Sequence, residues 1–129
     1  MANAQFDLAK GTVTIESEVI ARIAGYVAAM SYGVVGMAYR SKTDTVASLL
    51  KKDNYTRGIK VSISDDNKIS IDIHIIIEYG VNINVIGKSI INSVKYQVSH
   101  DTGLEVEQVN VCVEGFRVQE QEWINWLEK

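Results

Sequence analysis

The sequence predicts an α+β fold, a two-layer sandwich in which a small mixed β-sheet carries two main helices on one face. Isoleucine occupies every second position from Ile69 to Ile77, which is the spacing of a strand with one buried face. Apolar residues then recur every fourth position from Ile86 to Val98, as on one side of a helix. An alternating stretch over 106–116 follows, so a strand, a helix and a second strand succeed one another directly.

The size and composition of the chain predict one domain. At 129 residues, the chain can bury roughly two thirds of its unfolded surface in a single core. Apolar residues make up 47% and charged residues 22%, as in ordinary globular proteins, so disorder is not expected for the body of the chain. We expect residues 1–10 to form a loosely held arm, residues 11–118 to form the domain, and residues 119–129 to form a short amphipathic tail.

The first half of the domain predicts a strand followed at once by a helix. Residues 11–15 are mostly β-branched and fit a short strand. A helix is expected over Ser17–Ser31, with Ser17 as its N-cap, because apolar and small residues form one continuous stripe. Gly33 is expected to end this helix, since glycine readily takes the positive φ that follows many helix C-termini.

Residues 34–58 give a weaker pattern. The run 34–39 fits a strand, and the run 46–50 fits one or two helical turns. The segment is also basic, so we expect a solvated excursion at one edge of the domain. Its basic residues are Arg40, Lys42, Lys51, Lys52 and Arg57.

The second half predicts a β-hairpin and then a crossover. Residues 59–63 alternate, and the polar turn 64–68 joins them to the long strand over 69–79. The next helix is expected over Asn84–Asp101, with Gly103 placed to cap it. If the two strands that flank this helix are parallel, the unit is a right-handed crossover.

The last strand contains a change of face. Val109, Val111 and Val113 lie on one side of it, whereas Leu104 and Val106 have the opposite parity. A β-bulge near residues 107–108 would bring both groups to the core, because a bulge inserts one extra residue into the strand.

Charge and cysteine usage limit the class of protein. The formal net charge of −3 argues against a nucleic-acid-binding protein, because affinity for phosphate backbones comes mostly from clustered lysine and arginine. Cys112 is the single cysteine, so no internal disulfide can form and a reducing compartment is expected. Residues 1–10 carry Asp7 and do not resemble a signal peptide, and no run approaches the ~20 apolar residues of a membrane span. We therefore expect a cytoplasmic protein with no direct membrane insertion.

One set of polar residues contains metal-ligand types. His74 shares a strand face with Asp72 and Glu78, and Cys112 could lie on the same face of a neighbouring strand. Their spacing matches no known zinc pattern, and a solvent-facing strand surface explains them more simply. We predict no metal site and no cofactor.

No motif in the sequence predicts an enzyme. At His100–Asp101, stabilisation of a helix end by a cation at the dipole is favoured over an acid/base pair. The segment Gly33–Gly36 has the GxxG letters of a KH loop, but its two central residues are valines rather than the basic or polar residues that such a loop offers to phosphates. We therefore predict no catalytic residues.

Six short segments, in this order, resemble one known family. They are Gly11-Thr12-Val13-Thr14-Ile15, Ile23-Ala24-Gly25, Gly33-Val34, Glu78-Tyr79-Gly80-Val81-Asn82-Ile83, Thr102-Gly103-Leu104 and Val109-Asn110-Val111-Cys112-Val113-Glu114-Gly115. Together they resemble the alkaline shock protein family of envelope stress response proteins, also called the Gls-type general stress proteins, of Gram-positive bacteria. The resemblance implies a small cytosolic protein linked to cell-envelope or alkaline stress, with some members tethered to the membrane by a separate anchor protein and able to self-associate.

The functional prediction is a non-enzymatic scaffold or adaptor in envelope stress homeostasis, cytoplasmic and membrane-associated only through a partner. Two groups of residues are candidates for partner binding or self-association. They are Trp123, Trp126 and Leu127, which lie at helical spacing in the tail, and Lys51 and Lys52, which would face the acidic C-terminal end of another copy. The alternative is a KH-like RNA-binding module, because a sheet with helices on one face supports that function as well.

Overall fold

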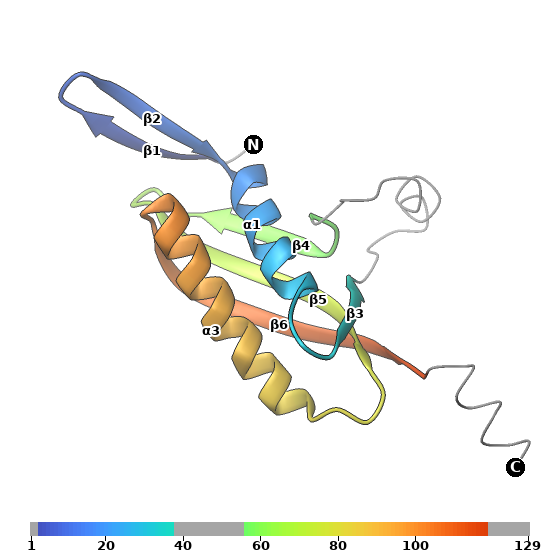
Figure 1. The fold of residues 1–129 in the computed structure, drawn as a ribbon. Helices are drawn as coiled ribbons and strands as arrows, with labels where there is room; N and C mark the ends of the chain where they lie inside the picture. Colours follow the sequence, from blue (N-terminus) through green and yellow to red (C-terminus); the bar gives the residue numbers. More distant parts are fainter. Residues whose placement is uncertain (1–2, 38–55, 119–129) are drawn as a thin grey trace, which may run out of the picture.

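The computed structural model describes residues 3–37 and 56–118, which are drawn in colour in Figure 1. It confirms the predicted α+β class: two helices cover one face of a four-stranded mixed sheet, and a two-stranded hairpin extends from the body. In chain order the elements are β1 (Asn3–Leu8), β2 (Gly11–Glu16), α1 (Ser17–Ala29), β3 (Val34–Met37), β4 (Ile59–Ile63), β5 (Lys68–Glu78), α3 (Ile83–Thr102) and β6 (Glu105–Arg117).

Strand β5 is the centre of the four-stranded sheet. Along one of its edges, β4 pairs antiparallel with residues 69–73 and β3 pairs antiparallel with residues 75–77. Along the other edge, β6 runs parallel to β5 over residues 68–78. The predicted hairpin of β4 and β5 is confirmed, and β5, α3 and β6 form a parallel crossover unit.

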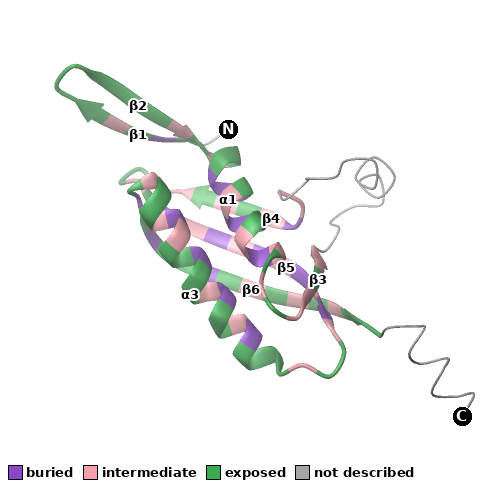
Figure 2. Ribbon diagram, viewed as in Figure 1, coloured by how far each residue is buried: buried purple, intermediate pink, exposed green. Residues whose placement is uncertain are grey.

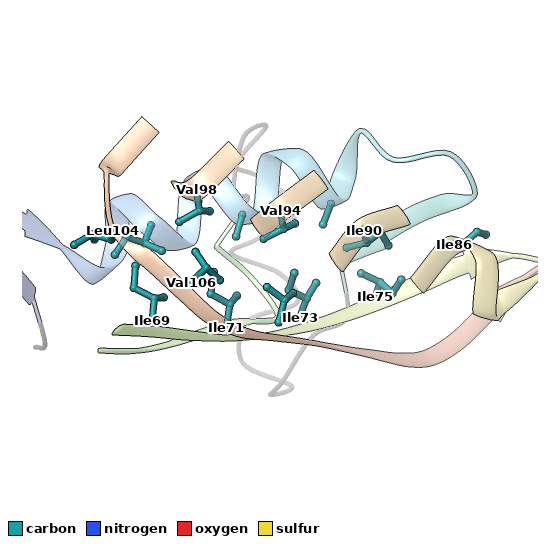
Figure 3. Packing of buried hydrophobic residues seen from close by; sticks show 14 of the residues in the cluster. Ile69, Ile71, Ile73, Ile75, Ile86, Ile90, Val94, Val98, Leu104 and Val106 are labelled. Carbon is teal, nitrogen blue, oxygen red and sulfur yellow. The ribbon is translucent and has the colours of Figure 1, made fainter. Parts of the chain in front are cut away.

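The core lies between the sheet and the two helices (Figure 3). On β5, the isoleucines from Ile69 to Ile75 that point toward the helices have no exposed surface. Facing them, α3 contributes its predicted stripe from Ile86 to Val98, which is also buried. Burial of one such side chain contributes roughly 1.5–3 kcal/mol, so this layer is the main source of stability.

Local hydrogen bonds explain where α3 begins and ends. At its start, the Asn82 side chain accepts a hydrogen bond of 3.1 Å from the Val85 N–H, as an N-cap residue does. At its end, Gly103 adopts a φ of 75° and its N–H donates to the Ser99 carbonyl over 2.9 Å. The predicted cap at Gly103 is confirmed.

The predicted arm at the N-terminus is wrong in one respect, because residues 3–8 form a strand. β1 pairs with β2 in an antiparallel hairpin, from Asn3 opposite Glu16 to Leu8 opposite Gly11. Its base is fixed to the body, since Ala4 is fully buried and the Asn67 side chain donates to the Gln5 carbonyl over 3.0 Å. Figure 1 shows the turn of the hairpin extending away from the sheet.

Helix α1 also differs from its prediction at both ends. Ser17 is its first helical residue rather than its N-cap, because the extended residue Glu16 precedes it and β2 continues directly into the helix. The helix ends at Ala29 instead of Ser31, and the Ser31 hydroxyl donates to the Val27 carbonyl over 2.8 Å beyond that end.

Two irregularities shape β6. The predicted bulge is confirmed, because Ile69 pairs with Val106 but Ser70 pairs with Gln108, which leaves Glu107 outside the register. A second shift, between Ile75 and Ile76, leaves Glu114 outside the register as well. The second bulge was not predicted.

Candidate functional site

The side of the sheet away from the helices carries a row of polar side chains, which we call the open face. It is defined by Asp72 and His74 on β5 and by Asn110, Cys112 and Glu114 on β6. The β5 members are half-buried because β5 has neighbours on both edges, whereas the β6 members are exposed (Figure 2). Polar side chains of different chemistry therefore stand beside one another on a rigid support.

Three of these side chains converge. One ligand-type atom each from His74, Cys112 and Glu114 lies within 4.8 Å of the other two. The Nδ1 atom of His74 is in contact with Oε2 of Glu114. This nitrogen is buried, although the contact does not have the geometry of a normal hydrogen bond.

The register of the sheet brings the three together. His74 and Cys112 are direct partners on adjacent parallel strands, and Glu114 lies two residues farther along β6. The bulge between the Ile75 and Ile76 pairs sits at Glu114, and bulges commonly re-aim a side chain. Here the Glu114 carboxylate is directed to the His74 ring.

The structure thus changes the set of residues that the sequence suggested. It brings His74 and Cys112 together, as their strand parity allowed, but it replaces Asp72 and Glu78 by Glu114. The Asp72 carboxylate instead accepts a hydrogen bond of 2.8 Å from the Asn110 side chain. Glu114 could have been found from its parity, because it is two residues from Cys112 and therefore shares its strand face.

The outer edge of β6 is a second feature of interest. Over residues 3–37 and 56–118, this thirteen-residue strand pairs only with β5. Alternate N–H and C=O groups of an edge strand point outward, where they can pair with another chain.

The segment Gly33–Gly36 has a structural explanation. Gly33 takes a φ of 86°, and a Cβ placed on it would overlap Cδ1 of Ile86, so glycine is required there for conformation and for packing. The following residues form β3, whose backbone pairs with β5. A KH loop presents free backbone to phosphates, so the KH-like alternative loses the loop on which it depended.

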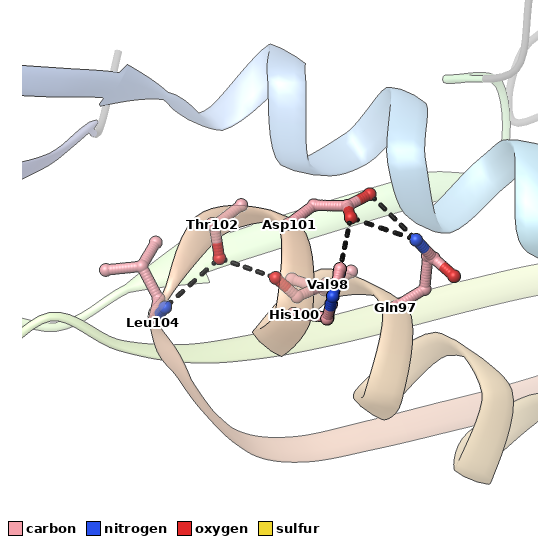
Figure 4. A network of polar contacts seen from close by, with 6 residues as sticks. All are labelled: Gln97, Val98, His100, Asp101, Thr102 and Leu104. Carbon is pink, nitrogen blue, oxygen red and sulfur yellow. Dashed lines mark hydrogen bonds and ion pairs between the residues drawn. The ribbon is translucent and has the colours of Figure 1, made fainter.

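The pair His100–Asp101 closes the end of α3 (Figure 4). Hydrogen bonds of 2.9 and 3.0 Å from the Gln97 amide lower the pKa of Asp101 below its usual value, and the His100 ring, 3.1 Å away, lowers it further. His100 lies in the last turn, as predicted for a cation at the negative end of the helix dipole. Both side chains are thus explained by stabilisation of the helix end.

A shallow pocket of about 450 Å³ lies next to this network, between α1 and α3. Apolar parts of α1 form much of its wall. The lining residues are Arg22, Ile23, Tyr26, Val27, Gln97 and Asp101. None of them is a cysteine, serine or histidine, so this pocket offers no nucleophile for covalent catalysis.

The other candidates for partner binding lie outside the described residues. Lys51 and Lys52 fall within 38–55, and Trp123, Trp126 and Leu127 fall within 119–129. Their roles stay predictions. Neither of the helices that the structure describes is long and apolar enough to cross a membrane.

Comparisons with known proteins extend these observations. The model of a family described by a cell envelope-related function matches residues 5–118. YloU of Bacillus subtilis is 39% identical over 109 residues, which cover 84% of this chain and 90% of that protein. Spy1614 of Streptococcus pyogenes is 38% identical over 109 residues, which cover 84% and 89%. YqhY of Bacillus subtilis is 31% identical over 107 residues, which cover 83% and 78%.

All three relatives are described as uncharacterized proteins, so they add no activity. One solved structure, a zinc form of a MamM CTD variant, aligns with a TM-score of 0.46 and 13% identity over 82% of this chain and 89% of its own, which is too distant to carry an argument. The family match and the two closer bacterial relatives agree with the fold and with the resemblance of the six segments. The chain belongs to the alkaline shock protein (Gls-type) family, whose described function is related to the cell envelope.

Proposed function

We propose that the protein is a non-enzymatic scaffold or adaptor of the cell envelope stress response, and that it acts by associating with copies of itself. It would work in the cytoplasm and reach the membrane through a separate anchor protein. The observation that carries this proposal is the unpaired outer edge of β6. Membership of a family with a cell envelope-related function supports the cellular setting.

A long free edge is unusual in a protein that acts alone. Natural sheets commonly shorten their edge strands or block them, because an open edge recruits other strands. β6 is thirteen residues long, more than twice the usual strand length of about 5–6 residues. Strand addition at such an edge is a well-known form of protein recognition.

The sequence of β6 is suited to antiparallel pairing with itself. If two copies pair about a two-fold axis through Val111, Glu105 of one copy lies opposite Arg117 of the other, and Val109 lies opposite Val113. Opposite charges and β-branched pairs are both favourable across strands, at roughly 0.2–1 kcal/mol each. A two-fold contact is isologous and closes on itself as a dimer.

The predicted contact through Lys51 and Lys52 has a different geometry. If this basic segment of one copy meets the acidic C-terminal end of the next, the contact is heterologous and can grow into an open chain or close into a ring. It would also weaken strongly with salt, because the screening length falls from ~10 Å at 0.1 M to ~3 Å at 1 M. The two modes of self-association can therefore be separated in solution.

Sedimentation velocity at low and high salt tests the proposal. We expect the wild type to form dimers, Arg117→Glu to weaken them by roughly twofold to thirtyfold, and Glu105→Arg combined with Arg117→Glu to restore them. The Lys51→Glu/Lys52→Glu variant is the matched control and should dimerise like the wild type. Glu105 also lies 3.8 Å from Lys68, so the melting temperature of each variant is measured in parallel.

Each contrary result has a definite meaning. A monomeric wild type at all concentrations would overturn self-association as the mode of action. Dimers that are insensitive to Arg117→Glu would place the contact away from the β6 edge. Loss of assembly in the lysine variant and at high salt would favour the head-to-tail contact instead.

A further inference from the structure

We propose that His74, Cys112 and Glu114 form a binding site for a divalent metal ion of the zinc type on the open face of the sheet. The site would use three protein ligands and leave the fourth coordination position to water or to another ligand. It is independent of the self-association proposed above, because it rests on the side chains of the open face and not on the backbone edge of β6.

The chemistry of the three side chains fits this class of ion. Zn²⁺ is bound by thiolate, imidazole and carboxylate groups, at about 2.0–2.3 Å from each ligand atom. Hard cations such as Mg²⁺ and Ca²⁺ prefer sites made entirely of oxygen. A mixed set of one sulfur, one nitrogen and one oxygen therefore selects a borderline-soft metal.

The geometry also fits. In tetrahedral zinc sites neighbouring ligand atoms are about 3.5 Å apart, as follows from the bond lengths. The three atoms here already lie within 4.8 Å of one another, so a shift of about 1 Å per side chain completes the arrangement. Cys112 and Glu114 are exposed and can rotate, whereas His74 on the central strand supplies a fixed point.

The ring of His74 gives an independent indication. Its Nδ1 atom is buried and has no hydrogen bond of normal geometry, although most buried polar atoms in proteins have one. A metal ion between this nitrogen and the Glu114 carboxylate would satisfy both groups. The bulge at Glu114 holds the carboxylate next to the ring, and regular pairing would place it farther along, beside Ile76.

The same three residue types also occur in nucleophilic triads, but the surroundings favour a metal. Reactive cysteines lie in electropositive surroundings, often at a helix N-terminus, whereas Cys112 lies in the middle of a strand with an acidic neighbour on its face. The acid of a triad is normally buried so that it fixes the histidine, whereas the side chain of Glu114 is 42% exposed.

The predicted site is an exchangeable one and not a structural one. The isoleucine layer already holds the sheet against the helices, so the fold does not depend on the metal. Asp72, the nearest acid toward the start of β5, is held by Asn110 and is not a fourth ligand. Removal of the metal should therefore leave the melting temperature nearly unchanged.

Titration of the reduced, full-length protein with Co²⁺ and then with Zn²⁺ tests the site. We expect one Co²⁺ per chain, a thiolate-to-cobalt charge-transfer band in the near ultraviolet, and displacement of Co²⁺ by Zn²⁺. Cys112→Ser should abolish the band. His74→Gln and Glu114→Gln should weaken binding by at least about tenfold, since even the loss of residues that only support a ligand costs 10–100-fold.

His100→Gln and Glu107→Gln are the matched controls, because they remove an exposed histidine and an exposed glutamate elsewhere. Both should bind Co²⁺ like the wild type. The site is overturned if the wild type gives no charge-transfer band, or if His74→Gln retains full affinity while its melting curve shows that it is folded. Equal losses in the control variants would mean non-specific binding and would also overturn it.

Discussion

The isoleucines of β5 are the residues on which the fold depends most. Every second one points into the layer between the sheet and the helices, and those from Ile69 to Ile75 have no exposed surface. Isoleucine suits this role because its branched side chain fits the pleated surface of a strand and loses little rotamer freedom there. Across the layer, Ile90 of α3 is also fully buried (Figure 3).

The first prediction concerns two of these residues. Ile73→Ala and Ile90→Ala should each lower the free energy of unfolding by ~2–5 kcal/mol, because each leaves a cavity in a closely packed layer. Ile83→Ala is the control: Ile83 is 53% exposed, so its truncation should change stability by less than about 0.5 kcal/mol. Urea unfolding monitored by circular dichroism measures all three, and equal values for buried and exposed sites would contradict the assignment of the core.

At the scale of the element, α3 shows how a helix is limited by its two ends. Asn82 satisfies an N–H of the first turn, and Gly103 reverses the chain so that Leu104 enters the core. The Thr102 hydroxyl donates to the Val98 carbonyl over 2.6 Å and accepts from the Leu104 N–H over 3.2 Å. These contacts join the helix directly to the start of β6 (Figure 4).

The second prediction compares two glycines of this helix. Gly103→Ala should destabilise the protein by ~1–2 kcal/mol, because alanine is strained at a φ of 75°. Gly87→Ala should instead stabilise it by up to about 1 kcal/mol: Gly87 lies inside the helix, and an added Cβ would meet no atom within 4 Å. Thermal melts of both variants check the opposite signs, and a shift in the same direction for both would refute the capping role of Gly103.

The elements that could be predicted from the sequence are those with a local signal. The hairpin of β4 and β5 and the helix α3 are marked by periodicity and by turn residues, and the bulge at Glu107 by a change in apolar parity. Strand β1 was missed because residues 3–8 show little alternation, and their pairing depends on β2. The bulge at Glu114 was missed because no buried residue follows Gly115 to reveal a change of face.

For the whole molecule, the sheet is covered by helices on one side only. The open face and the β6 edge follow from this asymmetry, since a central strand with three neighbours leaves the outermost strand unpaired on its far side. Neither feature could be read from the sequence, because both depend on which strands become neighbours. His74 and Cys112 are 38 positions apart, and only the parallel register makes them partners.

The third prediction concerns residues 119–129, which the sequence marks as a docking segment. The core of the described residues lies between Ala4 and Val109, so it is complete without this tail. A helix of about ten residues is marginal alone in water, and we therefore expect Trp123, Trp126 and Leu127 to become ordered on a partner. Deletion of residues 120–129 should shift the melting temperature by less than about 2 °C.

Fluorescence separates this expectation from its alternative, in which the tail folds back onto its own domain. Both tryptophans of the chain lie in the tail, so tryptophan emission reports on this segment alone. Solvent-exposed emission, open to acrylamide quenching, is expected for the isolated protein, and Trp123→Ala/Trp126→Ala should melt like the deletion variant. Shielded tryptophans together with a large loss of stability on deletion would show that the segment packs on its own sheet or helices, because burial of two indole rings contributes several kcal/mol.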